Sequence, residues 1–98
     1  MNMQALMQQA QKMQREMEKA QKELEAKEFK IVSAGGGIEV TIMGSKKITH
    51  IEIDESIIDP EDKEMLQDMI AVAVNEAISK VVSEEQAIMA KQQANLRF

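Results

Sequence analysis

The chain has 98 residues, which is enough for one domain and is a size at which small folds gain stability from oligomerisation. It contains no cysteine, which excludes disulfide frameworks, thiolate nucleophiles and cysteine-based zinc sites. Aromatic residues make up only 2% of the chain against nine methionines, so aliphatic side chains must form the core. The formal net charge of -5 argues, taken alone, against nucleic acid and anionic membranes as partners.

The charge is unevenly distributed along the chain. Up to Ala34 there are six basic and five acidic residues, a balance of +1, and the remainder carries -6. Most of the excess acid lies between His50 and Asp68, where eight carboxylates accompany a single lysine, Lys63. Because charges are screened over about 8 Å at physiological salt, an acidic region at one end of an elongated molecule hardly affects the other end. The net charge therefore does not exclude DNA binding by the N-terminal part.

Residues 3–27 follow a heptad pattern, with seven of the eight core positions apolar and no glycine or proline. This pattern predicts one helix about 36 Å long at 1.5 Å per residue. Its apolar seam is thin, because methionine and alanine bury less apolar surface than leucine or isoleucine and define a packing partner less strictly. A helix with such a seam needs a partner surface. The seam residues are Met3, Leu6, Ala10, Met13, Met17, Ala20 and Leu24.

The middle of the chain predicts a three-stranded antiparallel meander. A β-branched run over 29–32 ends at the glycine-rich segment 33–37, which is typical of a turn. Residues 38–43 alternate apolar and polar side chains, and a second turn over 44–47 leads to a third strand over 48–54. In that strand Thr49, Ile51 and Ile53 share a face, and Ile48 breaks the alternation and marks a bulge or the edge of the turn.

A second long helix is predicted to follow, from Asp59 as cap and Pro60 as first helical residue to about Gln92. Residues 94–98 are expected to form a short tail. The helix repeats apolar residues at helical spacing, which indicates a face that covers a sheet. The stripe comprises Leu66, Met69, Ile70, Ala73, Ala77, Ile78, Val81 and Ile88, and it is widened by Val72, Val74 and Val82.

The order helix, three strands, helix indicates one α+β domain over 1–98 in which the second helix lies on one face of the sheet. A lone three-stranded sheet has two unpaired edges and a second face to cover. Together with the small size and the scarcity of aromatic residues, this predicts an obligate homodimer.

Several segments follow one another in a distinctive order and spacing, namely the Met/Gln-rich opening over 3–17, the Gly-strand-Gly run over 35–44, residues 51–54, residues 62–70 and residues 73–77. In these segments the chain resembles the YbaB/EbfC family of bacterial nucleoid-associated proteins. The resemblance implies a tweezers-shaped homodimer, with sheets joined at the centre and projecting helical arms that engage DNA. The chain departs from the family at its ends, where the frequent Gly-rich start and Pro- and Met-rich tail are missing.

The candidate DNA-binding residues lie on the first helix. Lys12, Arg15, Lys19 and Lys22 are separated by 3, 4 and 3 positions, which places them on one helix face, away from the seam. Such a row of cations suits the phosphates of a DNA backbone. The alternative is a solvated surface with pairs within the helix, for example Arg15 with Glu18, and the resemblance favours phosphate contact.

Other polar residues give weaker signals for DNA. Sequence preference is expected from Gln8 and Gln11 or from DNA shape. Lys91 and Arg97 either extend the basic surface or complement the end of the second helix. The turn pair Lys46 and Lys47 is a weak candidate for DNA contact, and the absence of Trp and Tyr argues against single-strand stacking.

Nothing in the sequence favours catalysis. His50, Glu52 and Asp54 alternate along one strand and offer three metal ligands, but polar residues routinely line a solvated sheet face, and no second histidine is available. The segment 35–37 lacks the spacing of a nucleotide-binding loop. We therefore expect no catalytic residue, no metal, no cofactor, no small-molecule substrate and no membrane partner. The N-terminus lacks the features of a signal peptide or a membrane span, so we expect a cytoplasmic protein associated with the nucleoid.

The leading hypothesis is a non-enzymatic homodimer that binds double-stranded DNA through its phosphate backbone, with roles in nucleoid organisation and gene regulation. The rival is a protein-interaction or adaptor module that uses the Met-rich first helix without direct DNA binding.

Overall fold

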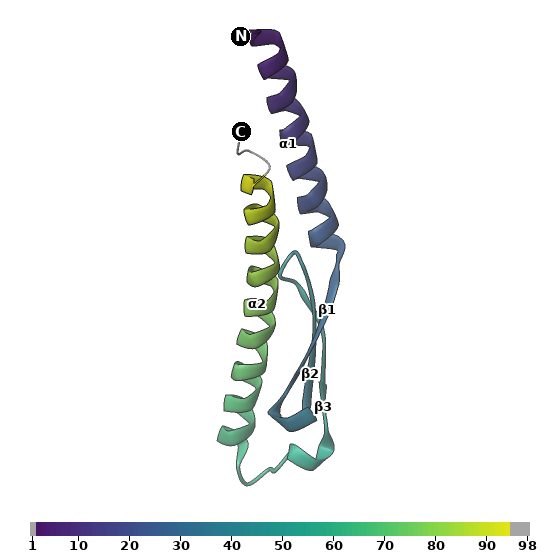
Figure 1. Cartoon of the computed structure of the whole chain (residues 1–98). Coiled ribbons are helices and arrows are strands. Elements are labelled where there is room, and N and C mark those ends of the chain that lie inside the picture. Colours follow the sequence, from purple (N-terminus) through teal and green to yellow (C-terminus); the bar gives the residue numbers. More distant parts are fainter. Residues whose placement is uncertain (1, 95–98) are drawn as a thin grey trace.

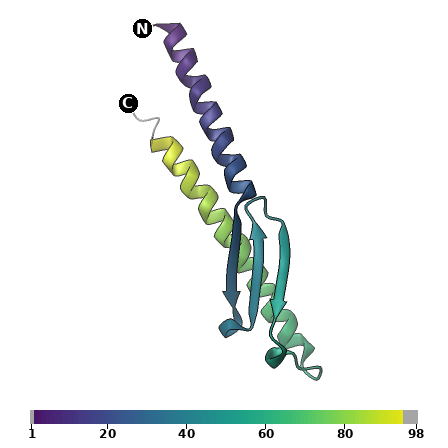
Figure 2. The same cartoon turned by 90° about the vertical axis from the view of Figure 1, so that its right-hand side faces the viewer.

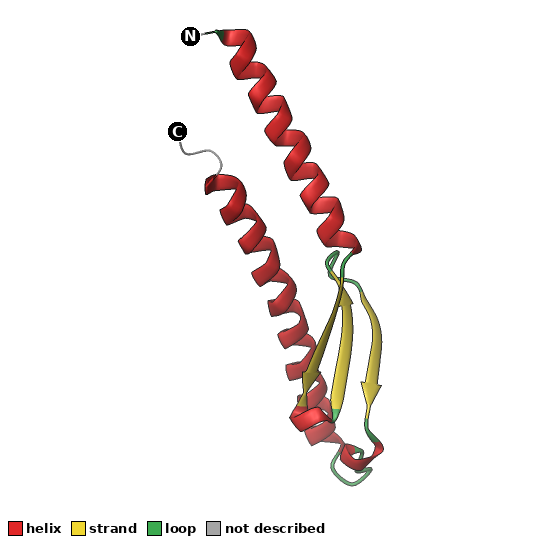
Figure 3. Ribbon diagram, turned by 45° about the vertical axis from the view of Figure 1, so that its right-hand side comes forward, coloured by secondary structure: helices red, strands yellow, loops and turns green. Residues whose placement is uncertain are grey.

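The computed structural model describes residues 2–94 and has the predicted α+β order (Figure 1). The molecule is elongated, with extents of 71 × 20 × 17 Å. Both long helices project from the sheet in the same direction, so the start of α1 and the end of α2 lie toward one end of the molecule (Figures 1 and 3). The elements are α1 (Met3–Ala26), β1 (Glu28–Ser33), the 3-10 helix η1 (Ala34–Gly36), β2 (Ile38–Met43), β3 (Ile48–Ile53), the 3-10 helix η2 (Glu55–Ile57) and α2 (Lys63–Ala94).

The sheet is the expected antiparallel meander, in the order β1-β2-β3. The expected irregularity in β3 is confirmed, and the unpaired residue is Thr49, because Ile48 pairs with Ile42 and His50 pairs with Thr41. The Thr49 hydroxyl lies 3.5 Å from the carbonyl oxygen of Thr41 and donates to it. The bulge turns Ile48 onto the same face as Ile51 and Ile53, whereas the sequence predicted Thr49 there.

The core lies between α2 and one face of β1 and β2, as predicted from the apolar stripe. Figure 2 shows α2 crossing behind the strands. Small residues of α2 let the helix approach the sheet closely, and apolar side chains of β1 and β2 fill the space between them. The buried core consists of Leu24, Phe29, Ile38, Val40, Ile42, Ala73, Ala77 and Val81.

The stripe on α2 is wider than the sheet surface that it covers, because α2 packs against β1 and β2 and barely reaches β3. Ile51 and Ile53 pair with the buried Val40 and Ile38, so they lie on the helix-facing side of the sheet. Ile51 nevertheless stays 37% exposed. The sheet therefore keeps an uncovered apolar edge on its helix-facing side.

The flank of α2 that faces this edge is apolar as well. Glu85 of α2 forms an ion pair of 3.2 Å with Lys46 in the turn between β2 and β3, which identifies the side of α2 nearest β3. Ile78 lies two helical turns before Glu85 on that side and is 37% exposed, and Val74 precedes it by one turn. We call the surface formed by Ile51, Ile53, Val74 and Ile78 the apolar shelf.

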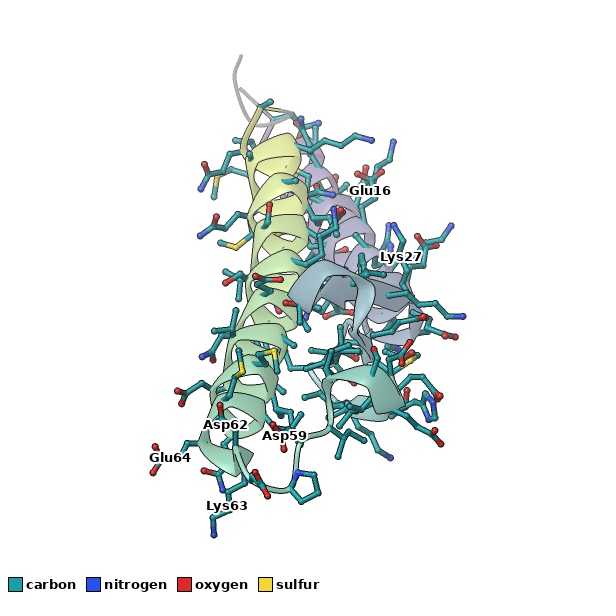
Figure 4. The ribbon with its side chains drawn as sticks, turned by 90° about the horizontal axis from the view of Figure 1, so that it is seen from below. Glu16, Lys27, Asp59, Asp62, Lys63 and Glu64 are labelled. Atoms are coloured by element: carbon teal, nitrogen blue, oxygen red, sulfur yellow. The ribbon has the colours of Figure 1, made fainter. Side chains whose placement is uncertain are left out.

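The start of α2 differs from the prediction by three residues. The helix begins at Lys63, and the Asp62 side chain caps it by accepting from the Met65 N–H at 3.2 Å. Asp59 and Pro60 lie in the loop, where the Asp59 carboxylate accepts from the Glu61 N–H at 3.0 Å and its carbonyl accepts from the Asp62 N–H. This hydrogen-bonded turn keeps residues 59–61 out of the helical conformation, so that Asp62 becomes the helix cap. Figure 4 shows Asp59 and Asp62 in this loop and at the start of α2. At the other end α2 extends to Ala94, and residues 95–98 of the expected tail lie outside the described part of the chain.

The junction between α1 and the sheet depends on Gly44. Its N–H donates to the carbonyl of Lys27 at 2.9 Å, and a side chain at this position would collide with the backbone carbonyl of Leu24. Because a backbone atom cannot give way as a flexible side chain can, any larger residue must move α1 relative to the sheet.

We therefore expect Gly44→Ala to lower the free energy of unfolding by about 3 kcal/mol, as overpacking against backbone does. The measurement is urea unfolding followed by circular dichroism. Ser45→Ala is the control, because Ser45 is exposed in the same turn and its loss should change stability by less than about 0.5 kcal/mol. Equal stabilities of the two variants would contradict this account of the junction.

Candidate nucleic-acid interface

The first helix is an arm attached to the sheet at one end. Of its 24 residues only Leu24 is buried, so almost the whole helix stands clear of the core. Asn2 caps the free end by accepting from the Gln4 N–H at 3.0 Å. At the attached end the Lys27 ammonium lies 5.1 Å from the centre of the Phe29 ring, a cation–π contact across the junction.

Four cations share the side of the arm opposite the seam. At about 100° per residue, Lys12, Arg15, Lys19 and Lys22 fall within an arc of about 80°, and the centre of that arc is opposite Leu24. All four side chains are exposed. The sequence prediction placed them together on one face away from the seam, and the helix does so. We call this row the basic ridge.

The basic ridge is free of carboxylate partners within residues 2–94. The ion pairs in this part of the chain are Lys46 with Glu85 and Lys80 with Glu84, and the His50 imidazole contacts the Glu52 carboxylate. The alternative interpretation of the ridge invoked pairs within the helix, such as Arg15 with Glu18, and these do not form. The positive charge of the ridge is therefore directed to solvent.

The remaining candidates are scattered over the molecule. Gln8 and Gln11 are exposed on the ridge side of α1. Lys91 lies on α2 and lines the cleft between the two helices with Ala20 and Leu24. Arg97 lies outside the described residues.

The turn between β2 and β3, which contacts the attached end of α1 through Gly44, carries Lys46 and Lys47. Lys46 is engaged with Glu85 and has a positive φ of 72°. A lysine that is already neutralised by a carboxylate has less to gain from a phosphate.

His50 and Glu52 of β3 and the following Asp54 do not form a metal-binding cluster. His50 Nε2 lies 2.9 Å from Glu52 Oε2, while the Asp54 carboxylate accepts from the Ser56 N–H at 2.9 Å and caps η2. This backbone N–H, with a further contribution from the Ser56 side chain, lowers the pKa of Asp54 below its ordinary value. Among residues 2–94 no three histidines or carboxylates are grouped so that they could hold a metal ion.

The eight acidic residues between His50 and Asp68 gather at the end of the molecule opposite the free end of the arm. They are exposed in β3, η2, the following loop and the first two turns of α2. Figure 4 shows Asp59, Asp62 and Glu64 at this end, with Lys63 as the neighbouring cation. The separation of charge that the sequence indicated is thus a separation in space, along a molecule 71 Å long.

Fold and surface together define an α+β protein with a meander between two long helices and a row of exposed cations on a projecting arm. Such a basic stripe is typical of proteins that bind nucleic acids. The family model described as the YbaB/EbfC DNA-binding family matches residues 1–96, and the chain belongs to this family. The resemblance predicted from the sequence is thereby confirmed.

Named relatives agree with this membership. The chain is 50% identical over 90 residues to a nucleoid-associated protein of Agathobacter rectalis, a match that covers 92% of this chain and 80% of the relative. It is 44% identical over 96 residues to a nucleoid-associated protein of Ligilactobacillus salivarius, with 98% and 92% covered. The fold matches the crystal structure of an uncharacterized protein of Helicobacter pylori with a TM-score of 0.77 at 22% identity, over 95% of this chain and 98% of that one. No helix within the described part of the chain is both long and apolar enough to cross a membrane.

Proposed function

We propose that this protein is a nucleoid-associated homodimer that binds double-stranded DNA mainly through phosphate contacts made by the basic ridge. The observation that carries the proposal is the row of four exposed cations, none of them paired with a carboxylate in residues 2–94. Membership of a family described as DNA-binding, and the names of its relatives, support DNA as the partner and the nucleoid of the cytoplasm as the location.

The dimensions of the ridge suit a duplex. From Lys12 to Lys22 the helix rises about 15 Å, which equals between four and five base-pair steps of 3.4 Å. Lysine and arginine reach phosphates on flexible side chains, and each neutralised phosphate releases counterions. Phosphate contacts position the protein, whereas any base preference is left to Gln8, Gln11 or DNA shape.

The acidic end supports one orientation on DNA. Its carboxylates repel phosphates, so the duplex is held at the arm and excluded from the opposite end of the molecule. A protein of net charge -5 then binds DNA through one local surface.

The apolar shelf supports the homodimer. A solvent-exposed surface made of isoleucine and valine from two elements is a costly feature for a protein with so few large core residues. A second copy that covers the shelf completes the layer over β3 and duplicates the basic ridge. Two ridges on one particle raise the overall affinity for DNA without any new kind of contact.

Binding of a duplex of about 30 base pairs, measured by fluorescence anisotropy between 50 and 200 mM salt, tests this function. Contacts from four cations on one arm, or eight on two, predict that log K falls against log salt with a slope of about -4 to -7. A slope near zero, or no binding at 50 mM salt, would refute phosphate recognition by the ridge.

A further inference from the structure

Toward the free end of α1 the apolar seam is mostly uncovered within the protomer, whereas Met13 and Ala20 are half-buried and Leu24 is buried. Met3, Leu6 and Met17 are 73%, 41% and 48% exposed. The second helix approaches α1 only near the attached end, where a cleft of about 300 Å³ is lined by residues that include Ala20, Leu24 and Ile88. From residue 3 to residue 17 the arm therefore presents a row of methionine, leucine and alanine in which Met13 is half-buried and the other members are exposed.

We propose that this seam pairs in antiparallel orientation with the seam of a second copy of the chain. The heptad spacing is the repeat that lets two helices pack side by side along their length. In an antiparallel register in which paired residue numbers sum to 23, all six positions from 3 to 20 meet an apolar partner. The layers are then Met3 with Ala20, Leu6 with Met17, and Ala10 with Met13, each occurring twice by symmetry.

The sizes of the side chains select this orientation. Both alanines of the seam are placed opposite a methionine, so that small and large side chains interlock in every alanine layer. A parallel, in-register pair would place Ala10 on Ala10 and Ala20 on Ala20, which leaves gaps, and would crowd Met13 against Met13.

The charges beside the seam permit the same pairing. No seam position from 3 to 24 carries a charge. In the antiparallel register the flanking contacts are Gln9 with Glu16 and Met7 with Gln14, so no like charges meet. The basic ridge lies on the opposite side of each arm and remains exposed. A second copy thus fits the seam while DNA occupies the ridge.

This pairing is different from the contact that covers the apolar shelf. Each arm has its sheet at the C-terminal end, so antiparallel arms hold two sheets at opposite ends of the paired helices. Two copies joined through their shelves hold their sheets together. Seam pairing therefore links one dimer to another and places ridges on the two outer sides of the paired arms. The pairing needs no DNA; only its use in bridging two duplexes depends on the proposed function.

Disulfide trapping tests the register, and the absence of native cysteine makes every added thiol diagnostic. Leu6→Cys and Met17→Cys chains, one of them lengthened by a tag, are mixed and equilibrated in a glutathione buffer without DNA. We expect a mixed disulfide between the two variants, in at least about tenfold excess over the control pair, because pairing raises the local thiol concentration. The control pair is Gln8→Cys with Arg15→Cys, whose numbers also sum to 23 but which lie on the ridge side.

Two outcomes would overturn the proposal. A mixed disulfide no more abundant than in the control pair would show that the seams do not meet, whether solvent or another protein covers them. A predominance of Leu6→Cys with itself and Met17→Cys with itself would show a parallel pair. Light scattering adds an independent measurement. In a double variant with Leu6→Glu and Met17→Glu, the assembly of linked dimers expected for the wild type should dissociate to single dimers. The helix signal of this variant in circular dichroism should be unchanged. Salt-dependent DNA binding by that variant would leave the proposed function standing.

Discussion

Replacement of Lys12, Arg15, Lys19 and Lys22 by glutamine is expected to abolish most of the affinity for double-stranded DNA and to leave the fold intact. Each cation that contacts a phosphate contributes about 0.9 to the slope of log K against log salt, so the slope should fall by up to about 4 per protomer. Glutamine is a good helix former, and the four side chains are exposed, so the arm itself should persist. Anisotropy titrations at several salt concentrations measure both the affinity and the slope.

The matched control removes the same amount of positive charge elsewhere. Lys30, Lys47, Lys63 and Lys80 are exposed and lie on β1, the β2–β3 turn and α2, so their replacement by glutamine changes the net charge equally without touching α1. The control should keep most of the slope. If both quadruple variants lost affinity to the same extent, net charge and not the ridge would govern binding, and the assignment of the site would be wrong.

The parts of the fold that the sequence specified best are those in which a single periodicity extends through an element. Strand β2 alternates without interruption and was predicted with its observed bounds, Ile38–Met43. The heptad over α1 gave its start at Met3 and its end to within one residue. The ridge followed from the same helix geometry, because spacings of 3 and 4 fix a shared face whatever the rest of the protein does.

The start of α2 was missed because two competing signals stand three residues apart. Asp59 followed by Pro60 has the composition of a helix start, and Asp62 has an equally good capping side chain. The choice depends on the turn that Asp59 closes after η2, which is a property of the whole loop. Local preferences alone do not rank the two.

The sequence predicted that the four cations of the candidate site share one helix face. It did not predict whether those cations are paired with neighbouring carboxylates. Whether Arg15 pairs with Glu18 depends on side-chain rotamers and solvation, and energies of a few tenths of a kcal/mol decide such pairs. The apolar shelf left a trace in the sequence, since Val74 and Ile78 make the stripe of α2 wider than one contact requires. Which strand the helix leaves uncovered depends on how α2 is placed across the sheet.

In the proposed homodimer, Ile78→Asp is expected to separate the two copies into monomers and to lower the thermal stability, because the substitution puts a carboxylate in the apolar shelf. Ile78 is 37% exposed in the protomer, so an aspartate there is solvated as long as the chain is alone. Burial of the shelf against a second copy would desolvate that charge at a cost of several kcal/mol. Light scattering should report the loss of the dimer, and the Tm of the variant should be independent of protein concentration, whereas the Tm of the wild type is expected to rise with it.

Val32→Asp separates this effect from a general intolerance of charge. Val32 is a β1 residue with 62% exposure and lies outside the shelf, so its substitution should leave the dimer and the dependence of Tm on concentration unchanged. Ile51→Asp introduces a carboxylate into the β3 side of the shelf and should reproduce the behaviour of Ile78→Asp. If both shelf variants remained dimeric, or if the wild type were a folded monomer at micromolar concentration, the second copy would not cover the shelf. Comparing the DNA affinity of monomeric shelf variants with that of the wild type measures what the dimer contributes. Monomers with an intact ridge should bind with about half the salt slope of a dimer that uses both arms.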